Sequence, residues 1–454
     1  MRPPRSPTVA LAAALALGGA ACAGAEGTIE IDVVAAPGSD LLERIQRARL
    51  TLTNPSEVVE AERDEEGHLS LSLEVVAEGQ SGTARLEGFD ADGELIALGL
   101  SPALPVAAVD ARITMYLAPP FSFAEAPVAL EPARSEVGGA LLPYGVVLAG
   151  GRDAGGDPLG SLLIYNVYDH SLQVGIDMPE PRAQVTVATG PSDFVYLFGG
   201  LDDEGAPSAD GWRFDSSVSP AGLYLALITD DSLARAGASA AYAGNETFFV
   251  AGDPAARIDS GRVVAIEDAV PAAGGAAATI VTLTTAPPVL VVGAGVGTTG
   301  AALYQSGVLR EIEGPPELMR TGHVLVPLPD GRLLVLGGAD PEGVPLASGV
   351  VYDPAEAAFS VMDDLLSPPR LAAAVAVTSD VVVIAGGTDE SGAPLADAEV
   401  LDAGDLRPEG TIPLGSERIG GLALPLPNRQ ILLASGVTGD GAPVPILELF
   451  TPAE

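Results

Sequence analysis

Residues 320–354 read RTGHVLVPLPDGRLLVLGGADPEGVPLASGVVYDP. An arginine precedes an apolar run that ends in Gly337-Gly338, and a Gly-x-Pro turn at Gly343 leads to a second apolar run. Short apolar runs that are separated by glycine and proline turns are typical of neighbouring antiparallel strands. The stretch therefore predicts a piece of β-sheet, and its recurrence along the chain decides the fold.

Two landmarks of this stretch recur in phase. The first is an apolar strand that ends in a pair of small residues, here called the small pair. Its strong copies are Gly150-Gly151, Gly199-Gly200, Gly337-Gly338, Gly386-Gly387 and Ser435-Gly436, and its weaker copies are Ala251-Gly252 and the segment Gly293-Ala294-Gly295. The second is a Gly-x-Pro six residues after each strong pair begins, with intervals of 49 residues from 156 to 205, 343 to 392 and 392 to 441. A fixed period of this length is the signature of a repeat architecture.

The repeat resembles the kelch motif, in which about 50 residues form one four-stranded blade of a β-propeller. The resemblance covers residues 121–454 and implies an all-β, seven-bladed propeller, with six blades as the alternative. It is weak in the third and fourth copies, which lack Gly-x-Pro. It also departs from the family in lacking the tryptophan that usually comes late in the repeat, since the only tryptophan is Trp212.

The last repeat is incomplete. After Gly436 there is room for only one further strand, Ile446–Phe450. The segment Phe121–Ala126 at the start of the repeat region is expected to supply the missing outer strand. This closure would remove an exposed sheet edge and lock the ring.

Arginines and aspartates recur around the small pairs. The arginines precede the strong strands at Arg134, Arg182, Arg320, Arg370 and Arg418, with Arg235 as a less clear copy, and the acidic residues follow the small pairs at Asp153, Asp157, Asp202, Asp203, Asp340, Asp389 and Asp440. In an antiparallel blade the two connections that carry them emerge on one face. Loops on a rigid scaffold commonly carry binding sites. The predicted binding rim is Arg182, Asp202, Asp203, Arg320, Asp340, Arg370, Asp389 and Arg418. The alternative is structural pairing of these arginines with neighbouring aspartates, about 0–1 kcal/mol each where exposed.

Residues 28–118 show a different pattern, with strict alternation of apolar and polar residues. It is seen from Ile29 to Val33, from Leu69 to Val75 and from Ile113 to Leu117. This alternation predicts a small β-sandwich, similar in architecture to immunoglobulin-like or transthyretin-like modules. Ala118-Pro119-Pro120 cannot continue a sheet, so the domain boundary is placed there.

For two segments of this region we prefer a structural interpretation to a functional one. Asp90–Glu94 is expected to be a type I′ hairpin turn on Asp92-Gly93 rather than a calcium loop, which would need further ligands. Leu41–Arg49 carries three arginines and is expected to form a short helical turn or a loop, with no function assigned.

The N-terminus has the features of an export signal. Arg2 and Arg5 precede a nine-residue apolar run, Val9–Leu17, which is too short to span a bilayer. Gly19-Ala20-Ala21-Cys22 resembles the lipobox of bacterial lipoproteins and implies lipidation of Cys22. Residues 1–21 are then a signal peptide and residues 22–27 a linker, with ordinary cleavage after Ala25 as the alternative. The expected location is the outer membrane or cell surface, or otherwise the periplasm or the medium.

Charge and composition restrict the possible functions. The net charge of −39 argues against nucleic-acid binding, because phosphate contacts need a basic surface. The single cysteine, Cys22, and the scattered His68, His170 and His323 predict no metal centre and no cofactor, with calcium on the acidic rim as the remaining alternative. Gly293–Gly300 contains a Gly-x-Gly-x-x-Gly, but Gly307 and Pro315-Pro316 leave no room for the helix that dinucleotide binding requires.

These observations favour a monomeric, non-catalytic lipoprotein of the cell envelope. Its propeller would be a binding platform for a protein or glycan partner, attached to the membrane only through lipid. The alternative is a propeller-based carbohydrate-active enzyme that uses rim carboxylates, since glycoside hydrolysis needs only two placed carboxyl groups.

Overall fold

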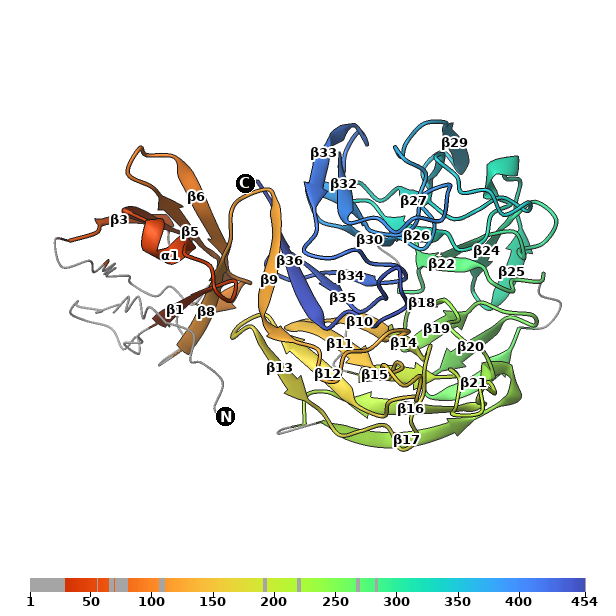
Figure 1. Cartoon of the computed structure of the whole chain (residues 1–454). Helices are drawn as coiled ribbons and strands as arrows, with labels where there is room; N and C mark the ends of the chain where they lie inside the picture. The colour runs from red at the N-terminus through yellow and green to blue at the C-terminus, as the bar shows by residue number, and fades with distance from the viewer. Residues whose placement is uncertain are drawn as a thin grey trace.

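The computed structural model describes residues 29–54, 56–64, 69, 81–105, 111–190, 194–218, 222–266, 270–281 and 285–453. These residues form a small N-terminal β-unit beside a ring of seven four-stranded antiparallel sheets (Figure 1). The predicted all-β fold with a seven-bladed propeller is confirmed. Within the described ranges, no helix is long and apolar enough to cross a membrane. The predicted signal peptide, Cys22 and the linker lie outside these ranges.

Each blade is built from four strands that follow one another from the axis outward. Blade one has β10 (Gly138–Leu142), β11 (Gly145–Ala149), β12 (Leu162–Asn166) and β13 (Ser171–Val174), and blade two has β14 (Thr186–Thr189), β15 (Phe194–Phe198), β16 (Asp210–Asp215) and β17 (Leu223–Thr229). Blade three has β18 (Ala240–Tyr242), β19 (Thr247–Val250), β20 (Ala256–Asp259) and β21 (Arg262–Ala265), and blade four has β22 (Ala276–Thr279), β23 (Val289–Val292), β24 (Ala301–Gln305) and β25 (Val308–Glu311).

The remaining three blades repeat this order. Blade five has β26 (Val324–Pro327), β27 (Leu333–Leu336), β28 (Gly349–Asp353) and β29 (Ala358–Met362), and blade six has β30 (Ala374–Val377), β31 (Val381–Ala385), β32 (Asp397–Asp402) and β33 (Pro408–Pro413). Blade seven has β34 (Leu422–Pro425), β35 (Ile431–Ala434), β36 (Ile446–Thr451) and β9 (Ser122–Ala129). The innermost strands contact each other in sequence, and β10 contacts β34, so the ring is closed.

The apolar runs that revealed the repeat form the second strand of each blade. Strands β11, β23, β27, β31 and β35 are buried along their whole length, because neighbouring blades cover both faces. The innermost strands are only partly buried, and β34 is partly exposed at every residue. The core of the propeller therefore lies between the second strands, and the innermost strands line the axis.

The ring is closed by a strand from the start of the propeller. Strand β9 pairs antiparallel with β36, with Phe123 opposite Phe450 and Ser122 opposite Thr451. The Phe450 ring lies 5.4 Å from that of Phe123 and 6.2 Å from that of Phe121. The prediction that the segment from Phe121 onward supplies the missing outer strand is confirmed.

The N-terminal unit contains a four-stranded sheet and a two-stranded parallel pair. The sheet has the order β3 (Ser56–Glu62), β2 (Arg47–Thr53), β5 (Ala84–Phe89) and β6 (Leu95–Leu100), and the pair is β1 (Ile29–Ala35) with β8 (Ala111–Leu117). Two short strands, β4 (Ser81–Gly82) and β7 (Leu104–Pro105), also pair. Their shared core includes Val33, Leu50, Leu86 and Met115.

Two sequence expectations for this unit can be compared with the structure. Leu41–Arg44 is a helical turn, α1, after which the chain enters β2. Most of the strand expected at Leu69–Val75 lies outside the described residues. The type I′ turn expected at Asp92-Gly93 is wrong, because that turn needs a positive φ at two successive residues and only Gly93 has one. Instead the Asp90 carboxylate accepts hydrogen bonds from the N–H groups of Asp92 and Glu94, both at 3.0 Å.

Tyrosines and a buried histidine join the N-terminal unit to the propeller. The Tyr116 hydroxyl donates to the carbonyl of Glu125 at 2.7 Å, and the Thr114 N–H donates to the carbonyl of Tyr168 at 2.7 Å. His170 is 2 % exposed, and its Nδ1 lies 2.7 Å from the Tyr165 hydroxyl. Its Nε2 has no hydrogen-bond partner within the described structure. Burial lowers the pKa of His170 to about 4 despite the nearby Asp169.

Acidification should therefore weaken this junction through His170. In the unfolded chain the imidazole takes up a proton near pH 6.5, whereas the folded protein keeps it neutral down to about pH 4. Stability that is present above pH 6.5 is lost as the pH falls toward 4, by about 2 kcal/mol at pH 5. His170→Asn, which tolerates the left-handed backbone (φ 51°) at this position, should remove this share of the pH dependence of urea unfolding. An unchanged difference between pH 7 and pH 5 would contradict the assignment.

Candidate functional site

The recurring arginines are buried. Arg134, Arg182, Arg320, Arg370 and Arg418 are each 0–1 % exposed. The expectation that Arg182, Arg320, Arg370 and Arg418 belong to an exposed binding rim is therefore wrong, because their guanidinium groups are covered by the connections around them. Their hydrogen bonds explain why arginine recurs here.

Each of these arginines binds the small pair of its own blade. The Nη1 group donates to the carbonyl of the first residue of the pair, and the partly exposed Arg235 of blade three repeats this contact. The pairs are Arg134 with Gly150 (3.3 Å), Arg182 with Gly199 (3.2 Å), Arg235 with Ala251 (2.6 Å), Arg320 with Gly337 (3.2 Å), Arg370 with Gly386 (3.1 Å) and Arg418 with Ser435 (2.7 Å). A buried carbonyl at the end of each second strand thereby gains a charged donor.

The backbone of the same arginines links neighbouring blades. The N–H of Gly151 donates to the carbonyl of Arg182 at 2.9 Å, and the N–H of Gly387 donates to that of Arg418 at 2.7 Å. Between the last and first blades, the Ser435 hydroxyl donates to the carbonyl of Arg134 at 3.1 Å. A side chain at Gly150 would not fit, because its Cβ would lie 2.2 Å from the Arg182 carbonyl oxygen.

Some of the buried arginines also form ion pairs, but not with the aspartates of the loops. Arg370 contacts Glu399 at 3.0 Å and Asp397 at 2.7 Å, both on β32. Arg418 contacts Glu448 on β36 at 2.9 Å. The alternative expectation, that these arginines pair with the predicted rim aspartates, is therefore also wrong, since the carboxylate partners of Arg370 and Arg418 come from third strands and Arg182 pairs with Glu180, two residues before it. Desolvation lowers the pKa of Arg320 to about 10.

The aspartates that follow the small pairs shape their own loops. One carboxylate oxygen of Asp202, Asp340 and Asp389 accepts the backbone N–H groups two and four residues later, at 2.8–3.0 Å. A hydrogen bond from the Ser391 hydroxyl is the main cause that lowers the pKa of Asp389. Asp203 is exposed beside Asp202. Asp203 is the most exposed of these four aspartates, whereas the other three are half-buried in the turns that they shape.

The arginine-bearing and aspartate-bearing connections do lie at one end of the propeller. Isolated bridges pair the residue after each arginine with the residue after the small pair, as in Ala183 with Leu201 and Leu371 with Thr388. We call this end the loop face. Its second-to-third-strand loops are long in five blades, at 150–161, 199–209, 337–348, 386–396 and 435–445. They are short in blades three and four, at 251–255 and 293–300.

A cavity of about 880 Å³ opens where the loops are short. Its wall comes largely from residues 234–239 and 273–276, with contributions from the innermost strands of blades one, five, six and seven. We call its opening the axial mouth. The charged groups at the axial mouth are Asp231, Arg235 and Asp253, and the rest of the wall is mainly alanine, glycine and serine with a few aliphatic side chains. Missing Gly-x-Pro turns in the third and fourth copies were the sequence signal for this opening.

His323 also lines the cavity. Its side chain is buried, with Nε2 3.0 Å from the Val292 carbonyl, which fixes the proton on that nitrogen. Burial lowers the pKa of His323 to about 4, so the ring is neutral at pH 7. Nδ1 has no partner among the described residues.

The glycine-rich loop 293–300 is occupied by a carboxylate of the same chain. Glu311 accepts the N–H of Thr299 at 2.8 Å and the hydroxyl of Thr298 at 2.6 Å. These hydrogen bonds lower the pKa of Glu311, with that from the Thr298 hydroxyl as the largest cause. Strand β24 follows the loop, where a dinucleotide-binding motif would place a helix. The donors of this loop are thus satisfied by an anion of the chain itself.

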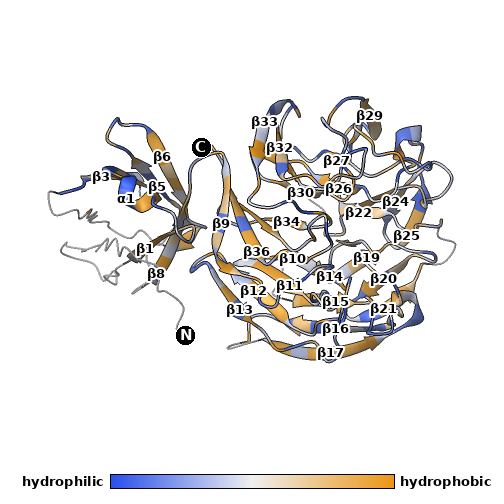
Figure 2. Ribbon diagram, viewed as in Figure 1, coloured by the Kyte–Doolittle hydropathy of each residue, from blue (hydrophilic) through white to orange (hydrophobic). Residues whose placement is uncertain are grey.

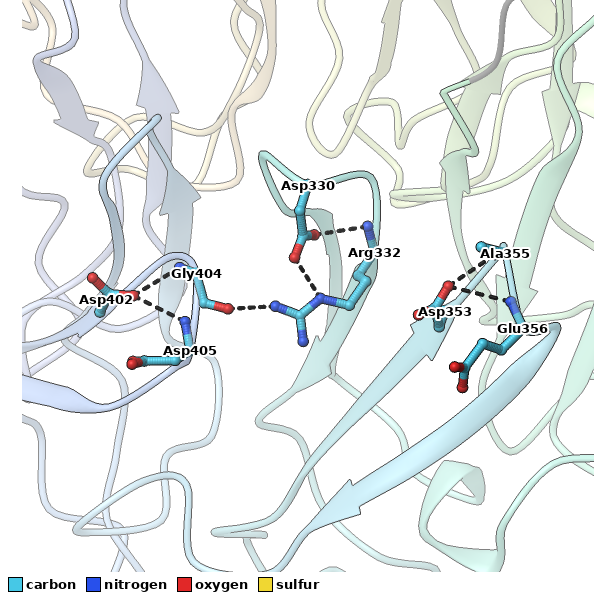
Figure 3. A network of polar contacts seen from close by, with 8 residues as sticks. All are labelled: Asp330, Arg332, Asp353, Ala355, Glu356, Asp402, Gly404 and Asp405. Carbon is cyan, nitrogen blue, oxygen red and sulfur yellow. Dashed lines mark hydrogen bonds and ion pairs between the residues drawn. The ribbon is translucent and has the colours of Figure 1, made fainter.

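The opposite end of the propeller carries a second polar network (Figure 3). The Arg332 side chain contacts Asp330 in its own turn and the carbonyl of Gly404 in blade six. Asp353 and Asp402 accept backbone N–H groups of the turns that they begin, as Figure 3 shows. These charges stabilise turns and link two blades. No group of three or more histidine, cysteine or acidic side chains in the described parts of the chain could hold a metal ion.

Removing a buried arginine should cost far more stability than removing an exposed one. Arg370→Ala should lower the free energy of unfolding by about 3–5 kcal/mol, because Glu399 would stay buried without its charged partner. Arg407→Ala removes an arginine whose side chain is 82 % exposed and pairs with Asp405, and it should leave stability nearly unchanged. Guanidinium titrations of both variants test this difference. Similar losses of unfolding free energy in the two variants would disprove the structural role of the buried arginine.

Comparison with known proteins finds similarity among solved structures only. No family model matches the chain, and no curated protein matches it. Among solved structures, the chain is similar to one described as "Structure of YjhT", with 14% sequence identity and a TM-score of 0.47. That similarity covers 72% of this chain and 96% of the other.

Proposed function

We propose that this chain is a binding protein whose propeller receives a partner at the axial mouth. The observation that carries the proposal is the coincidence of a cavity of about 880 Å³ with the two blades whose loops are short. The long loops of the other five blades surround the rest of the loop face, so the axis is reached from the side of blades three and four. The repeat pattern, which we attribute to kelch-type blades, supplies the rigid scaffold.

The wall of the cavity favours a polypeptide loop as the ligand. Alanine and glycine at positions such as Ala236, Gly274 and Gly275 leave this part of the wall without bulky side chains, so the main chain of a partner can approach it closely. The described residues that line it include no phenylalanine, tyrosine or tryptophan, and the ring of His323 is buried, so the wall lacks the large aromatic face on which a sugar ring commonly stacks. A protein partner therefore fits this cavity better than a glycan does.

The alternative function is hydrolysis of a glycan by two carboxylates. Asp231 and Asp253 both line the cavity and are the candidates for this chemistry. A general acid that works near neutral pH needs a raised pKa. Where a carboxyl pKa in the described structure departs from its ordinary value, it is lowered, as in Glu311 and Asp389. None of these shifted groups lines the cavity, so hydrolysis stays the second candidate function.

Blocking the axial mouth should abolish binding. Ala236 is exposed at the mouth, and Ala236→Trp should obstruct it without disturbing the core. Disulfide-constrained peptide loops selected on the purified chain from a phage library should lose at least tenfold in affinity for this variant, or about 1.4 kcal/mol. Ala393→Trp adds the same indole to an exposed position in a tall loop of blade six and should leave affinity unchanged.

A glycan array and a reducing-sugar assay distinguish the alternatives. If the selected peptide loops bind the Ala236→Trp variant as tightly as the wild-type chain, their binding site lies outside the axial mouth. Release of sugar by the wild-type chain, lost in both Asp231→Asn and Asp253→Asn, would establish the hydrolase instead.

We further propose that the protein is an exported monomer, anchored by lipid on Cys22. The support comes from the signal-like residues 1–21 and from the position of the only cysteine. Two or more acyl chains hold a protein stably at a membrane, at about 0.8 kcal/mol per buried CH₂ group.

Replacement of Cys22 tests the anchor. In a bacterial host, Cys22→Ser should abolish incorporation of an alkyne-labelled palmitate and move the protein from the detergent phase to the aqueous phase. Ser39→Ala serves as the processed, lipidated control. Equal labelling of Cys22→Ser, or a mature N-terminus after Ala25 in the wild type, would contradict lipidation at Cys22.

A further inference from the structure

The outer strand of blade two differs from the other outer strands. β17 reads LYLALIT over Leu223–Thr229 and contains neither a charged residue nor proline. Among the other outer strands, β9, β21, β25 and β33 contain charged residues or proline, and β13 and β29 are shorter. Natural sheets protect their edges with such charges, prolines or short strands. β17 lacks all three devices.

The alternate leucines of β17 are exposed. Leu223 is 44%, Leu225 45% and Leu227 63% exposed, and Figure 2 shows hydrophobic residues along this strand. Val174 and Ile176, which end the outer segment of blade one, are 65% and 44% exposed. Exposed apolar residues that gather in this way mark interaction sites.

The two segments lie side by side. The Tyr224 hydroxyl donates to the carbonyl of Ile176 at 3.2 Å, which joins the outer edges of blades one and two. β17 pairs with β16 on one side, and no described strand pairs with its other side. We call β17 together with Val174 and Ile176 the blade-two edge. It offers backbone hydrogen-bonding groups beside an apolar stripe.

Acidic residues lie at both ends of the blade-two edge. Asp215 is opposite Leu223 at one end, and Asp210 is opposite Thr229 at the other. Asp230 and Asp231 follow the strand directly. A second copy paired antiparallel would bring these carboxylates together, and each chain carries a net charge of −39. Basic residues on a partner would instead be attracted at both ends.

We propose that the blade-two edge binds an extended segment of a partner protein. The segment has apolar side chains at alternate positions and basic residues on both sides, and it adds a fifth strand to blade two. Main-chain hydrogen bonds supply affinity in this mode, and the alternate side chains together with the flanking charges supply specificity. The blade-two edge contributes no residue to the axial mouth, and only Asp231, which follows the strand, borders both.

A designed peptide tests the proposal with the full chain. The probe has a core of alternating valine and threonine with two lysines at each end, and its binding is followed by fluorescence anisotropy. The same core with glutamate ends should bind at least tenfold more weakly. A probe with N-methyl groups on alternate core residues, which blocks the new strand pairing, should lose binding to a similar degree.

Substitutions on the chain locate the site. Leu225→Lys combined with Leu227→Lys should weaken binding of the lysine-ended probe at least tenfold, because both positions become charged. Val308→Lys combined with Val361→Lys changes exposed valines of β25 and β29 and should leave binding intact. Circular dichroism and thermal melting should match between the two double variants, since all four positions are exposed. Ala236→Trp should also leave the probe bound.

Four results would overturn the proposal. Equal binding of the lysine-ended and glutamate-ended probes would exclude recognition by charge. Full binding of the N-methylated probe, or unchanged binding to the β17 double variant, would exclude strand addition at this edge. Sedimentation of the wild-type chain as a dimer that the β17 double variant dissociates would make a second copy the occupant.

Discussion

The contact on which the propeller depends most is the hydrogen bond between a buried arginine and the small pair of its blade. The pair ends a fully buried strand in a left-handed backbone, so its first carbonyl points into protein and needs a donor there. Arginine supplies that donor from the connection that leads into its blade, while its own carbonyl accepts an N–H from the preceding blade. The cost of burying a cation is offset by several charge-assisted bonds, each contributing about 1.5–3 kcal/mol. Strand ends and blade contacts are thereby fixed by a single residue per repeat.

The same constraint explains where the ring departs from its symmetry. Blade three keeps the arginine, Arg235, but its loop is short and its side chain is partly exposed at the axial mouth. Blade four has no such arginine, and there Glu311 satisfies the glycine-rich loop instead. The loops without the aspartate-capped turn are shorter. The buried arginine and the long loop are therefore modified or lost in the same two blades. The axial mouth opens on this side of the axis because these two loops are short.

The sequence predicted the ring well because its signals are periodic and local. Paired glycines, Gly-x-Pro turns and buried apolar runs each follow from backbone geometry within one repeat. The position of Arg370 or Arg418 could not be predicted in the same way, because its burial depends on the neighbouring connections and on acids such as Glu399 and Glu448. Those acids lie in third strands whose sequences, DAEVLD and ILELFT, do not show that a buried arginine contacts them. From the sequence alone a charged residue in a loop is expected at the surface, although the fold covers this arginine.

Burial of the arginines also changes the electrostatics of the surface. Five of the 22 basic residues are almost fully buried, whereas most of the 61 acidic residues stay in contact with water or in exposed loops. The field that a partner meets is consequently more acidic than a uniform distribution of the charges would produce. Such a field accelerates the approach of a basic partner and repels a second copy of the chain. At an uncharged strand such as β17, this selection by charge can act only through its acidic ends, while the apolar stripe and the open backbone edge supply the contact itself.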